Sequence, residues 1–293
     1  MKSLHSVLTS AHVIKNEKMN LRIAILDIDV LLLHEEAIPE LLERLIASIK
    51  NDGCLNHPII VDSESFLVLD GVHRVAALKK LKCKRVPACL VDYENPAIQV
   101  FSWYRTIKGA NAVKQLLAQV KHIGCSVEKV NQINENVIGV SPIVAAIKTL
   151  DESFLVSFQF DGLKEAYEVI ECIEKRLKTI GLEIKYETEF DAQQGLTQHQ
   201  ADAVLLAPKL TKQAIIEVAR SGKIFAHKAS RHIIPARPMR VCVPLNLLKT
   251  NRSLSEINEM LKSMLQRKRF KRIPSGSVFE GRRYEEDLYV FEE

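Results

Sequence analysis

The segment Leu69-Asp70-Gly71-Val72-His73-Arg74 combines residues that suit anion binding where a predicted strand gives way to a helix. Glycine at that point lets an anion approach the N–H groups of the first helical turn. Asp70 supplies a cap or a metal ligand, and His73 and Arg74 supply two donors. The segment therefore outlines a phosphate cradle. The simpler alternative, that Asp70 only caps the helix and Arg74 is a solvated cation, is slightly favoured for this segment alone, because such turns are common.

Two other segments carry polar groups beside predicted elements. His34-Glu35-Glu36 follows a predicted strand, where a carboxylate held near a hydroxyl can act as a general base. Glu36 is better explained as complementing the positive end of the next helix, and for Glu35 both explanations stay open. Ser230-Arg231-His232 offers a planar donor fork that fits a carboxylate or phosphate. For Arg231 alone, a surface salt bridge is the default interpretation.

The single tryptophan, Trp103, is a third feature that can be interpreted in two ways. A lone tryptophan is more often a core residue than part of a binding site. Its neighbours Tyr104 and Arg105 indicate partial exposure.

Alternating strands and helices must position these residues. Leu21–Val30 and Phe66–Leu69 are rich in apolar residues and predict strands. The apolar stripe of Pro39–Lys50 predicts a helix with proline at its start, and a second helix is expected from Asp70 through Leu81. The second half repeats this style, with a helix over Leu163–Ile180 that ends at a glycine.

Length and composition limit the classes of protein. The chain has 293 residues, 41 Lys+Arg against 36 Asp+Glu, and a net charge of +5, and at ~150 residues per domain this predicts two domains. The longest apolar run, Ile23–Leu33, contains two aspartates and is far shorter than the ~20 residues that cross a bilayer. With no secretory signal pattern and no cysteine spacing typical of zinc sites, we expect a cytoplasmic protein without membrane partners.

In this order and at about these spacings, the segments resemble the free serine kinases, which phosphorylate L-serine to O-phospho-L-serine. The resemblance covers roughly residues 20 to 240 and includes Lys108-Gly109 after Trp103-Tyr104. It implies an α/β protein with a ParB/sulfiredoxin-like N-terminal domain and a second α/β domain. The expected division is an N-terminal extension (1–20), a nucleotide-binding domain (21–124), a lobe with serine-binding residues (125–240) and a helical, basic extension (241–293).

The resemblance also implies roles for individual residues. Glu35 matches the general base, and Asp70 matches a carboxylate needed for catalysis that acts through Mg²⁺ or on the transferring phosphoryl group. Asp70, Gly71, His73 and Arg74 match the nucleotide contacts, and Trp103, Ser230, Arg231 and His232 match the serine-binding side. The donor is ATP or ADP, with ATP preferred here, and the product feeds cysteine or siderophore precursor synthesis.

The chain departs from the family pattern at two positions. Archaeal members carry histidine where this chain has Val72, and threonine where it has Ser230. Both changes are mild, since serine keeps the hydroxyl and Val72 need not touch a ligand. The residues after about Arg240 have no counterpart in the shorter family members.

Two alternatives share the same fold. Sulfiredoxin needs a cysteine nucleophile at the position of Val72, and a valine cannot attack, so that activity is excluded. A ParB-like DNA-binding regulator, with DNA as a possible partner, is favoured by the net charge and by a basic run at residues 267–272. The small charge excess and the lack of a clear helix-turn-helix pattern argue against it.

Overall fold

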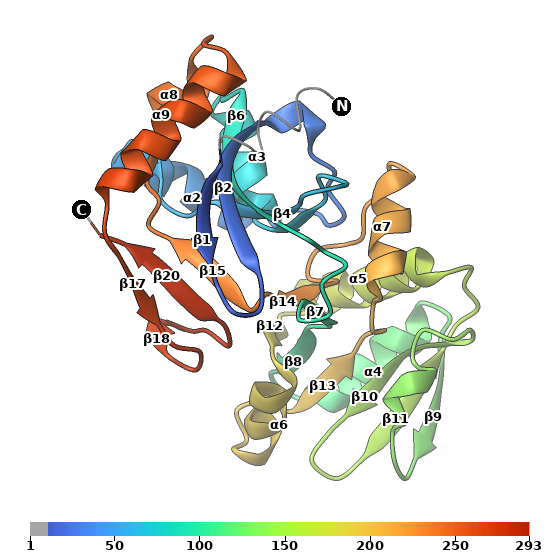
Figure 1. Ribbon diagram of the computed structural model, residues 1–293. Helices are drawn as coiled ribbons and strands as arrows, with labels where there is room; N and C mark the ends of the chain where they lie inside the picture. The colour runs from blue at the N-terminus through green and yellow to red at the C-terminus, as the bar shows by residue number, and fades with distance from the viewer. Residues whose placement is uncertain (1–10, 293) are drawn as a thin grey trace. The chain divides into compact units, whose positions relative to one another are not determined.

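The computed structural model describes residues 11–292 and divides them into two units (Figure 1). Unit 1 comprises residues 11–99 and 232–292, and unit 2 comprises residues 100–231. The chain passes between the units within two short strands, β7 (Gln99–Phe101) and β14 (Arg231–Ile233). Within the described residues, no helix has the length and apolar character that crossing a membrane would require.

These units differ from the domain boundaries expected from the sequence. Residues 100–124 belong to unit 2, and the chain from His232 onward returns to unit 1. Of the expected N-terminal extension, residues 1–10 lie outside the described residues, and His12–Lys15 form a strand of unit 1.

A five-stranded sheet forms the centre of unit 1, in the order β1-β2-β6-β4-β5. Its strands are β1 (His12–Lys15), β2 (Asn20–Asp27), β4 (Ile59–Asp62), β5 (Val68–Asp70) and β6 (Arg85–Val91). β6 is antiparallel to β2 and parallel to β4. All seven residues of β6 are buried, as expected for a central strand. The order leaves β5 at one edge, with Asp70 at its carboxyl end.

Among the described residues, four helices and a 3₁₀ turn accompany this sheet. They are η1 (Ile28–Val30), α2 (Pro39–Asp52), α3 (Val72–Lys80), α8 (Leu245–Lys249) and α9 (Leu254–Arg267). α2 begins with proline in its first turn, as the sequence predicts, and α2 packs against α3. α9 begins with a capping box between Ser253 and Glu256 and lies along β2 and β1 (Figure 1).

Smaller strand groups complete unit 1. β15 (Ala236–Met239), β20 (Asp287–Phe291) and β17 (Phe270–Ile273) form a three-stranded C-terminal sheet in the order β15-β20-β17. β3 (Cys54–Leu55) pairs with β16 (Val243–Pro244), and β18 (Val278–Phe279) pairs with β19 (Arg282–Arg283). The C-terminal sheet has its own apolar cluster around Leu288 and Val290.

Unit 2 contains a six-stranded sheet in the order β12-β8-β13-β10-β11-β9. Its strands are β8 (Tyr104–Lys108), β9 (Ser126–Val130), β10 (Ile143–Lys148), β11 (Ser153–Ser157), β12 (Glu183–Glu187) and β13 (Ala203–Leu206). Its helical elements are α4 (Ala112–His122), η2 (Glu135–Val137), α5 (Leu163–Thr179), α6 (Glu189–Thr197) and α7 (Lys212–Arg220). α5 packs against β10 and β12, and α6 packs against β8, β12 and β13. The expected α/β class is confirmed.

One asparagine of α9 completes the edge of β2 where β1 has ended. β1 pairs with β2 only as far as Ile23. At Ile25, the side chain of Asn258 makes the hydrogen bonds that a neighbouring strand would make. Its Oδ1 accepts from the Ile25 N–H at 2.7 Å, and its Nδ2 donates to the Ile25 carbonyl at 3.0 Å. Asn258 is buried, so these bonds satisfy two backbone groups that water does not reach.

Replacing Asn258 with leucine keeps its approximate size but leaves both backbone groups of Ile25 without that partner. We expect the free energy of unfolding to fall by about 2–6 kcal/mol, because each of the two unsatisfied buried groups costs about 1–3 kcal/mol. Urea denaturation measures this loss. The exposed Glu259→Gln variant of the same helix is the control, and equal stability of Asn258→Leu and the control would contradict the assignment.

Candidate active site

The turn between β5 and α3, residues Asp70 to Arg74, is built around a glycine and is called the Asp70 turn below. Gly71 is the N-cap of α3 and has φ of +106°, a conformation that favours glycine. A Cβ atom at Gly71 would lie 2.6 Å from Cγ2 of Ile59. Backbone conformation and space therefore both require glycine where the first N–H groups of α3 are presented to solvent or ligand.

The Asp70 carboxylate makes ion pairs instead of capping the helix. α3 has no side-chain cap, so the simple capping interpretation is wrong. Oδ2 of Asp70 accepts from Arg74 NH2 at 2.8 Å and also from Arg237 NH1. Arg74 NH1 in turn donates to the backbone carbonyls of His57, at 3.2 Å, and Pro58. Arg74 is therefore a fixed part of the turn rather than a solvated surface cation.

Arg237 and Glu286 were not predicted from the sequence. Arg237 is buried on β15, donates from NH1 to Asp70 and donates from Nε to Glu286, which is also buried. The signal that could have identified Arg237 is its position as a lone cation within the apolar run Ile233–Met239. Charged residues are almost never fully buried unless they are paired.

The charges around Asp70 keep it ionised. Burial raises the pKa of this carboxyl, but the guanidinium groups of Arg74 and Arg237 outweigh burial and hold the pKa well below its usual range. Asp70 is therefore a carboxylate at neutral pH. Both arginines contact Oδ2, so Oδ1 is the oxygen that could take a cation.

The loop that carries Glu35 runs beside β5 toward the same end of the sheet. Leu32 forms a parallel bridge with Leu67, with backbone hydrogen bonds from Leu32 N–H to Phe66 and from Val68 N–H to Leu32. Glu35 lies three residues after Leu32, and Asp70 lies three residues after Leu67. The bridge therefore places the start of the loop that carries the half-buried Glu35 beside the strand that leads to the Asp70 turn.

His73 holds the end of the Glu35 loop that follows Glu35. Its Nε2 accepts a hydrogen bond from the Ile38 N–H at 2.9 Å. The neutral ring therefore carries its proton on Nδ1, which is the nitrogen that can donate to an anion. The Leu32 bridge and the His73 bond thus hold the Glu35 loop on both sides of Glu35.

The predicted residue His232 lies beside the residue that precedes Glu35. The rings of His34 and His232 meet edge to face with centroids 5.6 Å apart, and both side chains are buried. The hydroxyl of Tyr93 lies 2.8 Å from Nε2 of His232. Burial lowers the pKa of His34, although nearby Glu35 and a backbone hydrogen bond with Val68 oppose that shift. Tyr93 was not predicted from the sequence.

The other predicted serine-binding residues form a cluster in unit 2, called the Trp103 cluster below. Trp103 Nε1 donates to the carbonyl of Ser230 at 2.9 Å. Lys228 Nζ lies 4.7 Å from the centroid of the Trp103 ring, and the Arg231 guanidinium carbon lies 5.9 Å from it. The structure therefore brings Trp103, Ser230 and Arg231 together and gives the cluster two cations.

A buried arginine ties together the two segments of the Trp103 cluster. Arg105 donates to the carbonyl of Trp103 at 2.6 Å and to the carbonyl of Lys228 at 3.1 Å. Its Nε donates to Glu174 at 2.7 Å, and both side chains are almost fully buried. Because one guanidinium contacts both segments, it fixes their spacing. The partial exposure that the sequence indicates for Trp103 is confirmed, because Trp103 is half-buried, whereas Arg105 itself is buried.

The carboxyl of Glu174 stays ionised inside unit 2. Burial raises its pKa, but hydrogen bonds from His227, the charge of Arg105 and the Tyr186 hydroxyl at 2.5 Å together bring the pKa down to about 2. A carboxyl with a depressed pKa contributes stability that is present above its unfolded pKa and is lost as the pH falls toward its folded pKa.

Glu174 should therefore make unit 2 sensitive to acid. Between pH 6 and pH 3 we expect the free energy of unfolding to fall by about 2 kcal/mol more in the wild type than in Glu174→Gln, from the pKa difference alone. Urea denaturation at both pH values measures this difference. Glu168→Gln, which removes an exposed carboxyl of the same helix, should behave like the wild type. An identical pH dependence for Glu174→Gln would refute the account.

The donor set of the Asp70 turn fits a magnesium ion that is held jointly with a nucleotide. Mg²⁺ in phosphoryl-transfer sites takes oxygen ligands, usually one or two carboxylates together with substrate phosphates. Asp70 supplies one ionised carboxylate beside the N-terminal end of α3. Asp70 therefore suits a shared ligand rather than one member of an all-protein cage.

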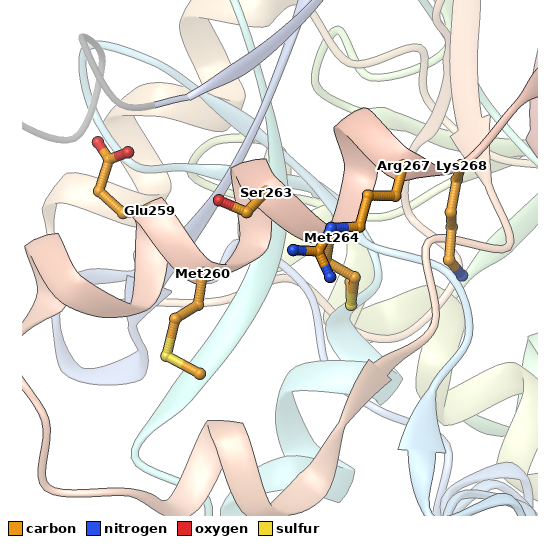
Figure 2. Close-up of a pocket in the computed structure, with 6 residues that line it drawn as sticks. All are labelled: Glu259, Met260, Ser263, Met264, Arg267 and Lys268. Carbon is orange, nitrogen blue, oxygen red and sulfur yellow. The ribbon is translucent and has the colours of Figure 1, made fainter.

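A separate cavity of about 820 Å³ lies along α9 in unit 1, and Figure 2 shows the six residues that line it. Met260 and Met264 alternate there with polar and basic side chains, and none of the predicted site residues lines it. Part of the basic run is offset by acidic partners, because Lys271 pairs with Glu292 at 3.0 Å and Arg272 pairs with Asp287 at 2.7 Å. This pairing weakens the electrostatic argument for nucleic acid.

Comparisons with known proteins agree with the fold and identify the family of the chain. The profile of the ParB N-terminal domain matches residues 11–102. An ATP-dependent L-serine kinase of Staphylothermus marinus is 30% identical over 238 residues, covering 77% of this chain and 90% of that protein. The ADP-dependent L-serine kinase of Thermococcus kodakarensis is 25% identical, covering 76% of this chain and 91% of that protein.

Comparison with solved structures also finds similarity to a serine kinase. The structure of a free serine kinase in complex with AMP matches with a TM-score of 0.67 and 26% identity, covering 77% of this chain and 93% of that chain. The expected ParB-like fold is confirmed, and these relatives favour an enzyme over a DNA-binding regulator. The chain belongs to the family of nucleotide-dependent L-serine kinases.

Proposed function

We propose that this protein transfers a phosphoryl group from ATP or ADP to the hydroxyl of free L-serine, giving O-phospho-L-serine. The observation that supports the proposal is the parallel bridge between Leu32 and Leu67, from which the Glu35 loop starts beside the strand that ends at Asp70. Membership of the L-serine kinase family supports the same reaction. Phosphoryl transfer depends mainly on positioning and on stabilising charge, and the residues described above suit both tasks.

The Asp70 turn would bind the phosphates of the donor. The N–H groups that begin α3 and the Nδ1 of His73 can donate to phosphate oxygens. Arg74 contributes positive charge beside them while it stays bonded to Asp70. Asp70 would hold Mg²⁺, which when bound neutralises charge on the phosphates.

Glu35 would act as the general base. Its carboxylate takes the proton of the serine hydroxyl while the hydroxyl oxygen forms a bond to the terminal phosphorus of the donor. The bond from that phosphorus to the bridging oxygen breaks, and ADP leaves when the donor is ATP, or AMP when the donor is ADP. The proton stays on Glu35 until it is released to solvent.

The serine would be held by the residues around Arg231. The guanidinium of Arg231 can pair with the serine carboxylate, and Ser230, Trp103 and His232 complete the serine-binding side. Arg231 directly precedes His232, whose ring lies against His34, the neighbour of Glu35. A contact with the carboxylate of a small substrate restricts where its single hydroxyl can lie.

The substrates and the cysteines suggest where the protein acts. The described cysteines are all free thiols, which suits a reducing compartment. Free serine and nucleotides, the two proposed substrates, are both present in such a compartment. We therefore propose a cytoplasmic enzyme whose product supplies cysteine or siderophore precursor synthesis.

The direct test is product formation. Purified protein is incubated with Mg²⁺, L-serine and either ATP or ADP, and phosphoserine is measured by mass spectrometry. We expect phosphoserine with at least one donor, and omission of Mg²⁺ should abolish it. If neither donor yields phosphoserine, the proposed function is wrong.

Glu35→Gln keeps the shape of the side chain but removes the proton acceptor. We expect kcat to fall by about 10²–10⁴-fold, the usual contribution of a general base, while nucleotide affinity stays close to that of the wild type. Steady-state kinetics and nucleotide titration measure the two quantities. The exposed neighbour provides the control, Glu36→Gln, which should keep its activity. Equal losses of kcat and nucleotide affinity in Glu35→Gln would contradict its role as base.

Arg231→Ala removes the group that would pair with the serine carboxylate. We expect the KM for serine to rise by about 10–100-fold, since a charge-assisted hydrogen bond is worth about 1.5–3 kcal/mol, with nucleotide affinity nearly unchanged. Arg220→Ala, which removes an exposed arginine at the end of α7, serves as the control. An unchanged KM for serine in Arg231→Ala would refute the contact.

A further inference from the structure

A series of ion pairs leads from the Asp70 turn into the C-terminal segment of the chain. Arg237 contacts Asp70 through NH1 and Glu286 through Nε. The side chains of Arg237 and Glu286 are only 8% and 6% exposed. A buried guanidinium requires carboxylate partners, and removing one of them leaves charge without compensation. Arg237 is therefore held in place from two sides.

The shape of the guanidinium couples Glu286 to Asp70. The group is a rigid plane in which Nε and NH1 donate in fixed directions. When Glu286 fixes Nε, it also fixes where NH1 points. NH1 donates to Oδ2 of Asp70, the same oxygen that accepts from Arg74. The orientation of the Asp70 carboxylate thus depends on Glu286, a residue that does not contact it.

The C-terminal sheet gives Glu286 a fixed backbone. β15 and β20 pair in parallel with Ala236 opposite Asp287 and Arg237 opposite Leu288. The Asp287 N–H donates to the carbonyl of Pro235 at 3.1 Å. Because a register slip would turn each side chain to the other face of the sheet, this pairing specifies that Glu286 meets Arg237.

We propose that Arg237 and Glu286 are positioning residues that orient Asp70 for Mg²⁺ and the transferring phosphoryl group, an inference that rests on the proposed function. Neither residue touches the substrate, and both act through Asp70. The resemblance of the sequence to the free serine kinases ends near residue 240. Glu286 therefore lies in a segment to which the resemblance assigns no function. Residues 270–291 thereby become part of the structure that supports the active site.

The test compares Glu286→Gln with Asp287→Asn. Both replace a carboxylate of the same segment by its amide, but Asp287 pairs with the exposed Arg272 rather than with Arg237. We expect Glu286→Gln to lower kcat by about 10–100-fold, the usual effect of losing a group that orients a metal ligand. The KM for serine should not change, because the serine contacts lie in the Trp103 cluster and at His232.

A second readout does not depend on turnover. ADP is titrated into each protein with and without Mg²⁺, and the gain in affinity due to Mg²⁺ should be about tenfold smaller in Glu286→Gln than in Asp287→Asn or the wild type. A merely structural role would lower the melting temperature without changing this gain or the kcat of the folded enzyme. If Glu286→Gln keeps the wild-type gain and kcat, the inference is wrong.

The outcomes separate this inference from the proposed function. Absence of phosphoserine from the wild type refutes the function, and the ADP titration still tests the positioning of Asp70. If Glu286→Gln does not fold, Arg237→Lys keeps the positive charge but loses the rigid fork, and it must reduce the Mg²⁺-dependent gain in ADP affinity. In a double-mutant cycle, Glu286→Gln should add nothing to Arg237→Lys, whereas additive losses would contradict action through Arg237.

Discussion

The candidate site residues of unit 1 centre on the carboxylate of Asp70 and the two arginines that contact it. Arg74 connects the carboxylate to the carbonyls before β4, and Arg237 connects it to the C-terminal sheet. These contacts keep Asp70 charged and fix it beside Gly71, whose conformation opens the end of α3. Two stretches far apart in sequence, the Asp70 turn and β15, therefore meet at one carboxylate.

Local patterns were sufficient to predict the elements that position the site. The apolar stripe and Pro39 predicted α2, and the strand before Asp70 and the helix after it appear as β5 and α3. The sequence did not reveal that the chain from His232 onward returns to unit 1. That return depends on long-range contacts, such as those of Asn258 with Ile25, which leave no periodic signal near either residue.

Prediction of the site from sequence was also limited to residues that lie close together in the chain. Asp70, Gly71 and Arg74 are neighbours in the chain, so their spacing indicated a shared task. Arg237 lies 167 residues after its partner Asp70, and Glu286 lies 49 residues after Arg237. Only the fold brings these three residues together. The burial of Arg105 likewise depends on a distant residue, because its partner Glu174 lies on a helix 69 residues away. Burial of such a charge depends on a partner that composition does not reveal.

The most direct measurement is a crystal structure of the protein with ADP, Mg²⁺ and L-serine. We expect the phosphates at the N–H groups that begin α3, the metal on Asp70, and the serine hydroxyl within hydrogen-bond distance of the Glu35 carboxylate. A nucleotide bound away from the Asp70 turn, or a serine hydroxyl that Glu35 does not reach, would contradict the account.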